Sequence, residues 1–284
     1  MPDIAIITDT DASLPDAVCE QYGIQQVPIT VNFGSEVLRT GIDIDDAGLF
    51  ARIDREGTMP TTSAPAPGDF STAFEEAFES GANTVLCLCV SSEVSATYGA
   101  AVLARQALPE RDIHVVDTLN LTMGQGFMVL AAAEAAQEGK PVLEILNIVE
   151  QVRERSHMYA VLPTLKYLAM SGRVGSLAAG FADVISIKPI LTVRDGKLEL
   201  LERVRTLKKA WRRAIELSGE AVGTSQVERM AIVHVNAESE AIEFYNQLNE
   251  TAPFSGEVIY TQLTPGLSVH SGAGMVGVCF VAAG

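Results

Sequence analysis

The chain has 284 residues, 48% of them hydrophobic, so it can bury a large core and is not disordered throughout. Its net charge of −16 lies entirely within residues 1–160, and such acidity argues against a general nucleic-acid binder. No apolar run reaches the roughly 18 residues that a membrane span needs. The N-terminus has no basic region and carries Asp3, so it is typical of a buried strand and not of a signal peptide. The four cysteines are scattered without a CxxC motif, and we expect a cytoplasmic protein with free thiols.

The first 160 residues alternate apolar runs with helical stretches. The first predicted helix has Ser13 as its cap, Pro15 and Asp16 in its first turn, and Gly23 at its end. Strands are predicted at 4–8, 24–33, 84–90 and 113–117, and helices at 95–107, at 124–137 and from Pro141 onward. The apolar stripe of that last helix comprises Leu143, Leu146, Val149 and Val152. This succession is typical of a parallel sheet covered by helices, and the acidic segment 34–68 is expected to form a surface excursion.

The remaining residues have a different pattern, in which short strands follow one another. Strands are predicted at 159–162, 189–193, 198–201, 230–235, 257–262 and 276–282, and helices at 206–217 and 239–249. Asp195 and Gly196 between two of the strands predict a tight hairpin, because both residues readily adopt a positive φ. We therefore expect an α/β protein of two domains: residues 1–160 with the parallel sheet, and residues 161–284 as an α+β domain with a largely antiparallel sheet.

Four segments rich in Ser, Thr, Gly and His are candidates for a binding site. They cover residues 60–70, 91–98, 170–175 and 270–277. In the second segment, Ser92 and Ser95 follow a strand and precede a helix, where free N–H groups bind anions. A plain helix cap by Ser91 or Ser92 accounts for that segment equally well. In the last segment, His270 lies among glycines that let a ligand approach the backbone.

Several catalytic motifs are absent. There is no phosphate-binding GxxxxGK[ST] loop and no GxSxG nucleophile elbow. Gly272, Gly274 and Gly277 have the GxGxxG spacing of a dinucleotide-binding motif, but they precede a predicted strand, whereas that motif precedes a helix. The four histidines lack metal-ligand spacing, so neither a metal nor a cofactor is expected. Asp9 and Asp11 could serve an aspartate-dependent phosphatase of the haloacid-dehalogenase type, although no matching lysine or second acidic loop is evident.

Taken in order, nine segments of the chain resemble the DegV family. They are ITDTDASLP, VPITVNFG, PTTSAPAPGDF, SSEVSATYGAA, VVDTLNLTMGQGF, LKYLAMSGRVG, IKPILTVRDGKL, VRTLKKAW and VHSGAGMVG. The family is similar to the fatty-acid-binding subunits of bacterial fatty acid kinase. The resemblance implies a two-domain, non-catalytic protein that holds a long-chain fatty acid in a tunnel. A separate ATP-dependent kinase subunit then phosphorylates the carboxyl group, and the acyl phosphate feeds phospholipid synthesis.

The resemblance also implies roles for individual residues. Thr62, Ser95 and His270 are expected to bind the carboxylate, together with the neighbouring Ser63, Ser92 and Ser271. The residues expected to face the kinase are basic: Arg173, Arg203, Arg205, Lys208, Lys209, Arg212 and Arg213. The chain departs from the family pattern at Ala96, where glycine is usual, and at Ala273, where a proline is usual; both changes put the acyl-chain preference in question. A carrier of another apolar ligand remains an alternative.

Overall fold

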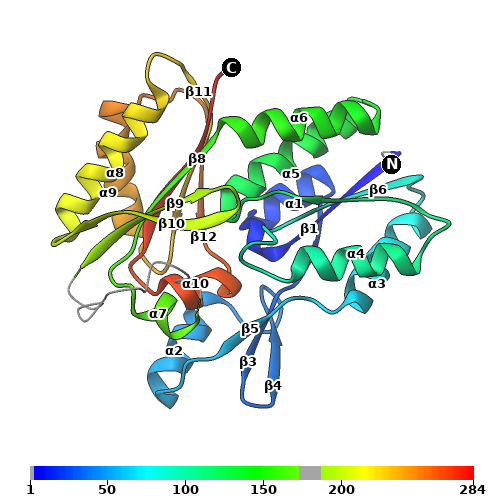
Figure 1. Ribbon diagram of the computed structural model, residues 1–284, viewed down its shortest axis with the longest axis horizontal. Coiled ribbons are helices and arrows are strands. Elements are labelled where there is room, and N and C mark those ends of the chain that lie inside the picture. The colour runs from blue at the N-terminus through cyan, green and yellow to red at the C-terminus, as the bar shows by residue number, and fades with distance from the viewer. Residues whose placement is uncertain (1–2, 173–186) are drawn as a thin grey trace.

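The computed structural model describes residues 3–172 and 187–284. Figure 1 shows two sheets and their helices arranged in layers, with a smaller sheet below them. The strands are β1 (Ile4–Asp9), β2 (Gln25–Val27), β3 (Thr30–Phe33), β4 (Glu36–Arg39), β5 (Thr61–Ser63), β6 (Thr84–Cys89), β7 (Asp112–Asp117), β8 (Ser156–Val161), β9 (Lys188–Arg194), β10 (Lys197–Val204), β11 (Val227–His234), β12 (Val258–Gln262) and β13 (Val276–Ala282). The helices are α1 (Asp16–Tyr22), α2 (Asp46–Glu56), α3 (Pro67–Glu79), α4 (Thr97–Ala107), α5 (Thr122–Gln137), α6 (Val142–Arg155), α7 (Lys166–Met170), α8 (Leu207–Val222), α9 (Glu238–Thr251) and α10 (Pro265–Ser271).

The first sheet has four parallel strands in the order β2-β1-β6-β7. Helices α3 and α4 pack on one of its faces, and α5 packs on the other against β1 and β6. Because both faces are covered, β6 is apolar and buried along nearly its whole length. The predicted helix-covered parallel sheet is therefore confirmed.

The second sheet has six strands in the order β10-β9-β8-β13-β11-β12, all antiparallel except the pair β11 and β12. Helices α8 and α9 cover its outer face, on the left of Figure 1. The hairpin between β9 and β10 forms as predicted, with φ of +49° at Asp195 and +77° at Gly196. This sheet confirms the largely antiparallel arrangement expected of the second half.

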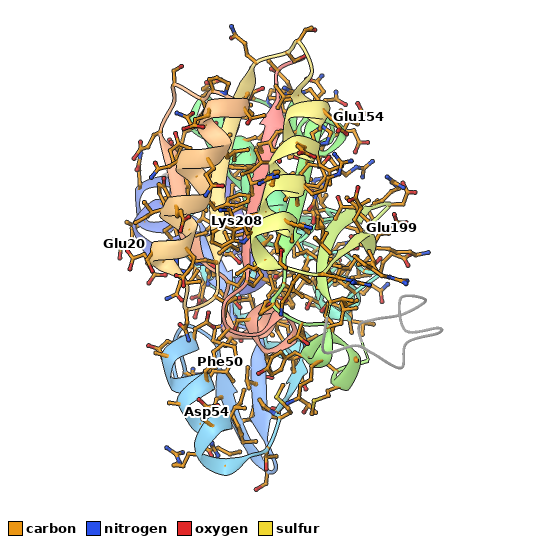
Figure 2. The ribbon with its side chains drawn as sticks, turned by 90° about the vertical axis from the view of Figure 1, so that its left-hand side faces the viewer. Glu20, Phe50, Asp54, Glu154, Glu199 and Lys208 are labelled. Carbon is orange, nitrogen blue, oxygen red and sulfur yellow. The ribbon has the colours of Figure 1, made fainter. Side chains whose placement is uncertain are left out.

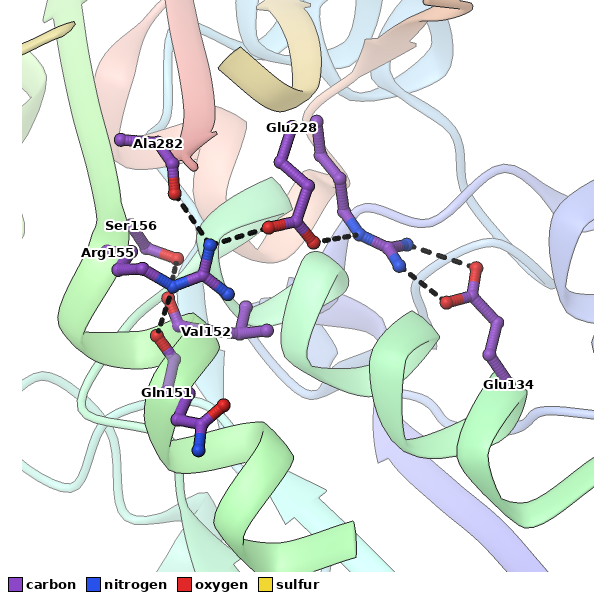
Figure 3. Close-up of polar contacts among 8 residues, drawn as sticks. Glu134, Gln151, Val152, Arg155, Ser156, Glu228 and Ala282 are labelled. Carbon is purple, nitrogen blue, oxygen red and sulfur yellow. Dashed lines mark hydrogen bonds and ion pairs between the residues drawn. The ribbon is translucent and has the colours of Figure 1, made fainter. Parts of the chain in front are cut away.

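Helix α5 joins the two sheets. It contacts β1 and β6 on one side and β8, β11 and β13 on the other, and nearly all of its residues are buried. A network of charges beside it links the same parts (Figure 3). The Arg229 guanidinium donates to both carboxylate oxygens of Glu134 on α5, and Arg155 at the end of α6 donates to Glu228 at 2.5 Å and to the carbonyl of Ala282 at 2.7 Å. The relative position of the sheets is thus held by apolar packing and by partly exposed ion pairs.

The acidic segment forms a small layer of its own. Strands β4-β3-β5 make a three-stranded antiparallel sheet, and α2 lies between β4 and β5 in the chain. It lies at the bottom of Figure 1, next to α10. The predicted surface excursion is therefore an ordered unit whose side packs against the last helix of the chain.

Some predictions of local structure are wrong. Ser13 does not cap α1; it has a φ of +53° and ends the 3-10 turn at Thr10–Ala12, while Pro15 stands at the N-cap. Leu143 is 75% exposed, and Ile145 is buried in its place beside Val149 and Val152. His270 lies in the last turn of α10, and neither α10 nor α7 was among the predicted helices.

Two further observations concern the whole chain. The second sheet begins at Ser156, close to the predicted division at residue 160; two separate domains remain a prediction. In the part of the chain that the structure describes, no helix is both long and apolar enough to cross a lipid bilayer.

Candidate functional site

A cavity of about 670 Å³ lies where the layers meet. Its floor is the inner face of the six-stranded sheet, where Met158, Ala160 and Leu162 alternate along and beyond β8 and Leu191 lies opposite on β9. Its other walls come from β5, from α10 and from the segments that follow β1, β6 and β7. The volume is in the range of small-molecule sites, and the wall is mostly aliphatic with a few polar groups. Such a cavity suits an elongated apolar ligand that carries one polar end.

The first and the last predicted segments meet in this cavity. Thr62 on β5 faces Val31 of β3, and its Oγ1 lies 3.1 Å from Nε2 of His270 on α10. Both side chains are half-buried. Since the two residues are 208 positions apart in sequence, only the fold brings them together. The pair offers hydrogen-bonding groups to a ligand near the solvent boundary.

The remaining predicted head-group residues, Ser63, Ser92, Ser95 and Ser271, line the same cavity. Ser95 is half-buried, and its Oγ lies 2.8 Å from Thr97 Oγ1 at the start of α4. The hydroxyl of Ser63 accepts a hydrogen bond from Asn32 at 2.8 Å. The structure thus brings all six candidates to one cavity; which of them touch a ligand stays a prediction.

The serine segment is held in place by its neighbours. Ser91 Oγ donates to the carbonyl of Gly196 at 2.8 Å, so the hairpin of the six-stranded sheet supports it. Fully buried Asp9 supports it from below: Asp9 Oδ2 accepts from the Val90 amide at 2.7 Å and from Gln125 at 3.2 Å. Despite these hydrogen bonds, burial raises the pKa of Asp9 to about 6. Asp9 does not line the cavity and its other oxygen accepts from the Asp11 amide, an arrangement that argues against a nucleophilic role in a phosphatase.

Helix α10 is fixed by two carboxylates. Asp11 Oδ1 accepts from Thr264 at 3.3 Å, and Gly266 permits this close approach, since a Cβ there would lie 2.4 Å from the same oxygen. Ser268 donates to Asp46 Oδ1 on α2, and both residues are buried. Burial raises the pKa of Asp46 to about 7. These contacts determine where His270 lies relative to Thr62.

Sequence reasoning missed several residues of the wall. Asp11 lines the cavity, although it was considered only as a phosphatase candidate. Leu121 and Thr122 at the start of α5 also line it and had no assigned role. The alternation of Met158, Ala160 and Leu162 is a period-two signal that could have identified the floor. Nothing in the local sequence of Thr122 marks it as part of a site.

The basic residues lie elsewhere. Arg173 lies outside the described residues. The six other predicted cations lie on β10, after it and on α8, and none of them lines the cavity. Helix α8 covers the outer face of the six-stranded sheet, and Lys208 lies on the side turned to the viewer in Figure 2. Arg213 is held by Glu202, Glu216 and Glu220 at 2.8–3.2 Å, so its charge is already compensated. The described basic residues therefore lie on or just after the edge strand β10 and on the outer helix α8, and their role in facing a kinase stays a prediction.

The departures from the family pattern fit the backbone. Ala96 is exposed and has a φ of −79°, which any residue adopts. Gly272 and Gly274 have φ of +82° and +86°, so the turn after His270 depends on glycines at these two positions and not on a proline between them.

Among the described residues, no cluster of three or more His, Cys, Asp or Glu side chains could hold a metal ion.

Comparison with known proteins finds relatives along the whole chain. A sequence model of the DegV family, described as uncharacterised proteins, matches residues 3–283. A DegV domain-containing protein of Streptomyces coelicolor is 34% identical over 275 residues, or 97% of each chain. A solved structure from Thermus thermophilus, described as fatty acid binding of a DegV family protein, is similar with a TM-score of 0.92 at 29% identity over all of both chains. The structure of DegV from Bacillus subtilis, described as a fatty acid binding protein, has a TM-score of 0.90 at 28% identity, again over both whole chains.

Proposed function

The chain belongs to the DegV family, and we propose that it binds one long-chain fatty acid in the cavity between its sheets. The observation that carries this proposal is the cavity itself, which combines a long aliphatic floor with a half-buried polar end. The description of DegV structures from Thermus thermophilus and Bacillus subtilis as fatty acid binding supports it. A fatty acid has the same division into an apolar chain and one polar group.

The carboxylate would lie at the polar end, near Thr62, Ser95 and His270. A carboxylate only accepts hydrogen bonds, so the groups around it must donate. When His270 Nε2 carries the proton and donates to Thr62 Oγ1, the Thr62 hydroxyl donates its own proton to a ligand oxygen. Ser63 and Ser92 line the same cavity and are available as further donors. Ser271 also lines it, and its hydroxyl would have to turn from the carbonyls of Leu267 and Ser268, to which it donates at 3.3–3.4 Å.

The acyl chain would supply most of the affinity. Burying about 14 methylenes at about 0.8 kcal/mol each contributes on the order of 11 kcal/mol before ordering costs. Hydrogen bonds to the head group contribute about 1–3 kcal/mol and chiefly determine which end of the ligand faces solvent. Loss of a head-group donor should therefore misplace the carboxylate more than it releases the ligand.

The protein would act as a carrier that presents the bound carboxylate to an ATP-dependent kinase. The product would be an acyl phosphate for phospholipid synthesis. The exposed cations Arg203, Arg205, Lys208, Lys209 and Arg212, with Arg173, would dock that partner. In a chain of net charge −16, a local basic surface favours an acidic partner and should speed association.

The variants Thr62→Val, Ser95→Ala and His270→Gln test the head-group assignment. Titration calorimetry with palmitate and with oleate should show each variant binding about 5- to 30-fold more weakly, equivalent to about 1–2 kcal/mol. Phosphorylation by the partner kinase should fall more steeply, because its rate depends on placing the carboxyl oxygen correctly. Asn32→Ala, which removes only the partner of Ser63, is the matched control and should change both quantities less. If all three variants bind the fatty acids and support their phosphorylation as well as the wild type does, the assignment is wrong. Selective binding of a different apolar compound would show that the protein carries another ligand.

A further inference from the structure

A buried hydroxyl that is not among the proposed head-group residues lies in the cavity wall. Thr122 is 2% exposed and lines the cavity, and its Oγ1 has no hydrogen-bond partner among the described residues. A buried hydroxyl without a partner is destabilising by about 1–3 kcal/mol, and native proteins rarely retain one without a reason. This position is therefore a candidate contact for a polar group of the ligand.

Thr122 is more buried than the proposed head-group residues, of which only Ser271 is also buried. Thr62, Ser95 and His270 are half-buried, and Ser63 and Ser92 are exposed, so they mark the side nearest solvent. Thr122 lies deeper, at the start of α5, a helix that packs against β8 and β13. The amides of Met123 and Gly124 in the same turn approach the Cys279 sulfur, and Cys279 pairs with the cavity residue Met158. Thr122 thus lies beside the floor of the cavity, where the acyl chain of the proposed ligand would pack.

The backbone holds Thr122 in an unfavourable conformation. Its φ is +46°, which is rare for a β-branched residue. The preceding loop keeps it there: Thr118 Oγ1 donates to the carbonyl of Cys89 at 2.8 Å, and the Leu121 amide donates to Asn120 Oδ1 at 3.0 Å. A Cβ at Gly124 would lie 2.2 Å from that Asn120 oxygen, so the turn is closely packed as well. The backbone that carries this hydroxyl is consequently held in the cavity wall.

We propose that Thr122 is a specificity-determining contact and that it binds a hydroxyl group on the chain of a hydroxylated fatty acid. An alcohol suits this position because it both donates and accepts hydrogen bonds, as Thr122 Oγ1 does, and brings no charge into an apolar wall. The inference rests on the proposed function, since it assigns the acyl chain of that ligand to this part of the cavity.

A thermodynamic cycle on the delipidated full-length protein tests the proposal. Affinities are measured for octadecanoic acid and for a series of hydroxyoctadecanoic acids in which the hydroxyl moves along the chain. Thr122→Val keeps the shape and the β-branch and removes only the hydroxyl, whereas Thr122→Ser keeps the hydroxyl. For one position of the ligand hydroxyl, the ratio of the affinity for the hydroxylated acid to the affinity for octadecanoic acid should be about tenfold greater in the wild type than in Thr122→Val. Thr122→Ser should retain that preference.

Each outcome has one meaning. If every hydroxylated acid shows the same relative affinity in the wild type and in Thr122→Val, the inference is wrong, even though binding of octadecanoic acid by both proteins would leave the proposed function intact. If the wild-type protein binds neither octadecanoic acid nor any hydroxylated acid, the proposed function itself fails. Thermal unfolding without ligand gives a second readout: Thr122→Val should unfold at an equal or higher temperature, because it removes a buried hydroxyl without a partner.

Discussion

The substitution Asp46→Asn tests the electrostatics of the contact that holds α10. Asp46 is 3% exposed, it accepts a hydrogen bond from Ser268, and its second oxygen has no partner among the described residues. Desolvation by burial raises its pKa from 3.8 to about 7. Because the folded state holds the proton more tightly than the unfolded state, this group stabilises the fold fully only at low pH. Its contribution is lost as the pH rises from about 4 to about 7.

The magnitude follows from the separation of the two pKa values. About three pH units at about 1.4 kcal/mol each correspond to ~4 kcal/mol between the two limits. Asparagine has nearly the same shape and does not ionise. The free energy of unfolding of Asp46→Asn minus that of the wild type should therefore increase by about 1.4 kcal/mol per pH unit between about pH 5 and pH 7. Above that range the difference should become constant.

Urea unfolding at half-unit pH intervals measures this difference. Asp54→Asn, an exposed position on the same helix, controls for the loss of one negative charge from α2. A constant difference between Asp46→Asn and the wild type across the range would refute the reasoning, because it would show that Asp46 ionises alike in the folded and unfolded states.

Two further predictions concern the parts that hold the site together. Gly196→Ala should lower the free energy of unfolding by about 2 kcal/mol, because φ is +77° and the new Cβ would lie 2.6 Å from Ser91 Oγ. The control Gly34→Ala, with φ of +61° and open space around it, should lower it by about 1 kcal/mol. Equal losses for the two variants in urea unfolding would show that the close approach to Ser91 costs nothing. Arg229→Met should lower the free energy of unfolding by about 2–3 kcal/mol, because it leaves Glu134 without its partner, and adding Glu134→Gln should recover part of that loss. Strictly additive effects in this double-mutant cycle would show that the pair is not coupled.

The strands and most helices could be predicted because their signals are local. The apolar run at 84–90 indicates β6, and Asp195-Gly196 indicates the hairpin through its required positive φ. Helix α10 could not be predicted in this way, because seven residues that include proline, glycine and two serines give no helical period. The three-stranded sheet escaped prediction for a similar reason: β4 and β5 are short and largely exposed, so they lack an apolar face.

The candidate site could be predicted in part. Local sequence pointed to Ser92, Ser95 and His270, the family resemblance added Thr62 and the carboxylate-binding role, and the structure brings all four residues to one cavity. Asp11 and Thr122 depend on contacts between segments far apart in sequence, as in the hydrogen bond from Thr264 to Asp11. The role of the basic residues in facing a kinase stays a prediction; sequence alone did not show that Arg213 is paired with glutamates or that α8 covers the outer face of the sheet.

The most direct test of fatty acid binding is native mass spectrometry of the protein purified from its expression host without added lipid. The proposal predicts one retained ligand per chain, and solvent extraction should identify it as a long-chain fatty acid, hydroxylated or not. Protein that arrives empty and then fails to take up added palmitate or oleate would contradict the central claim.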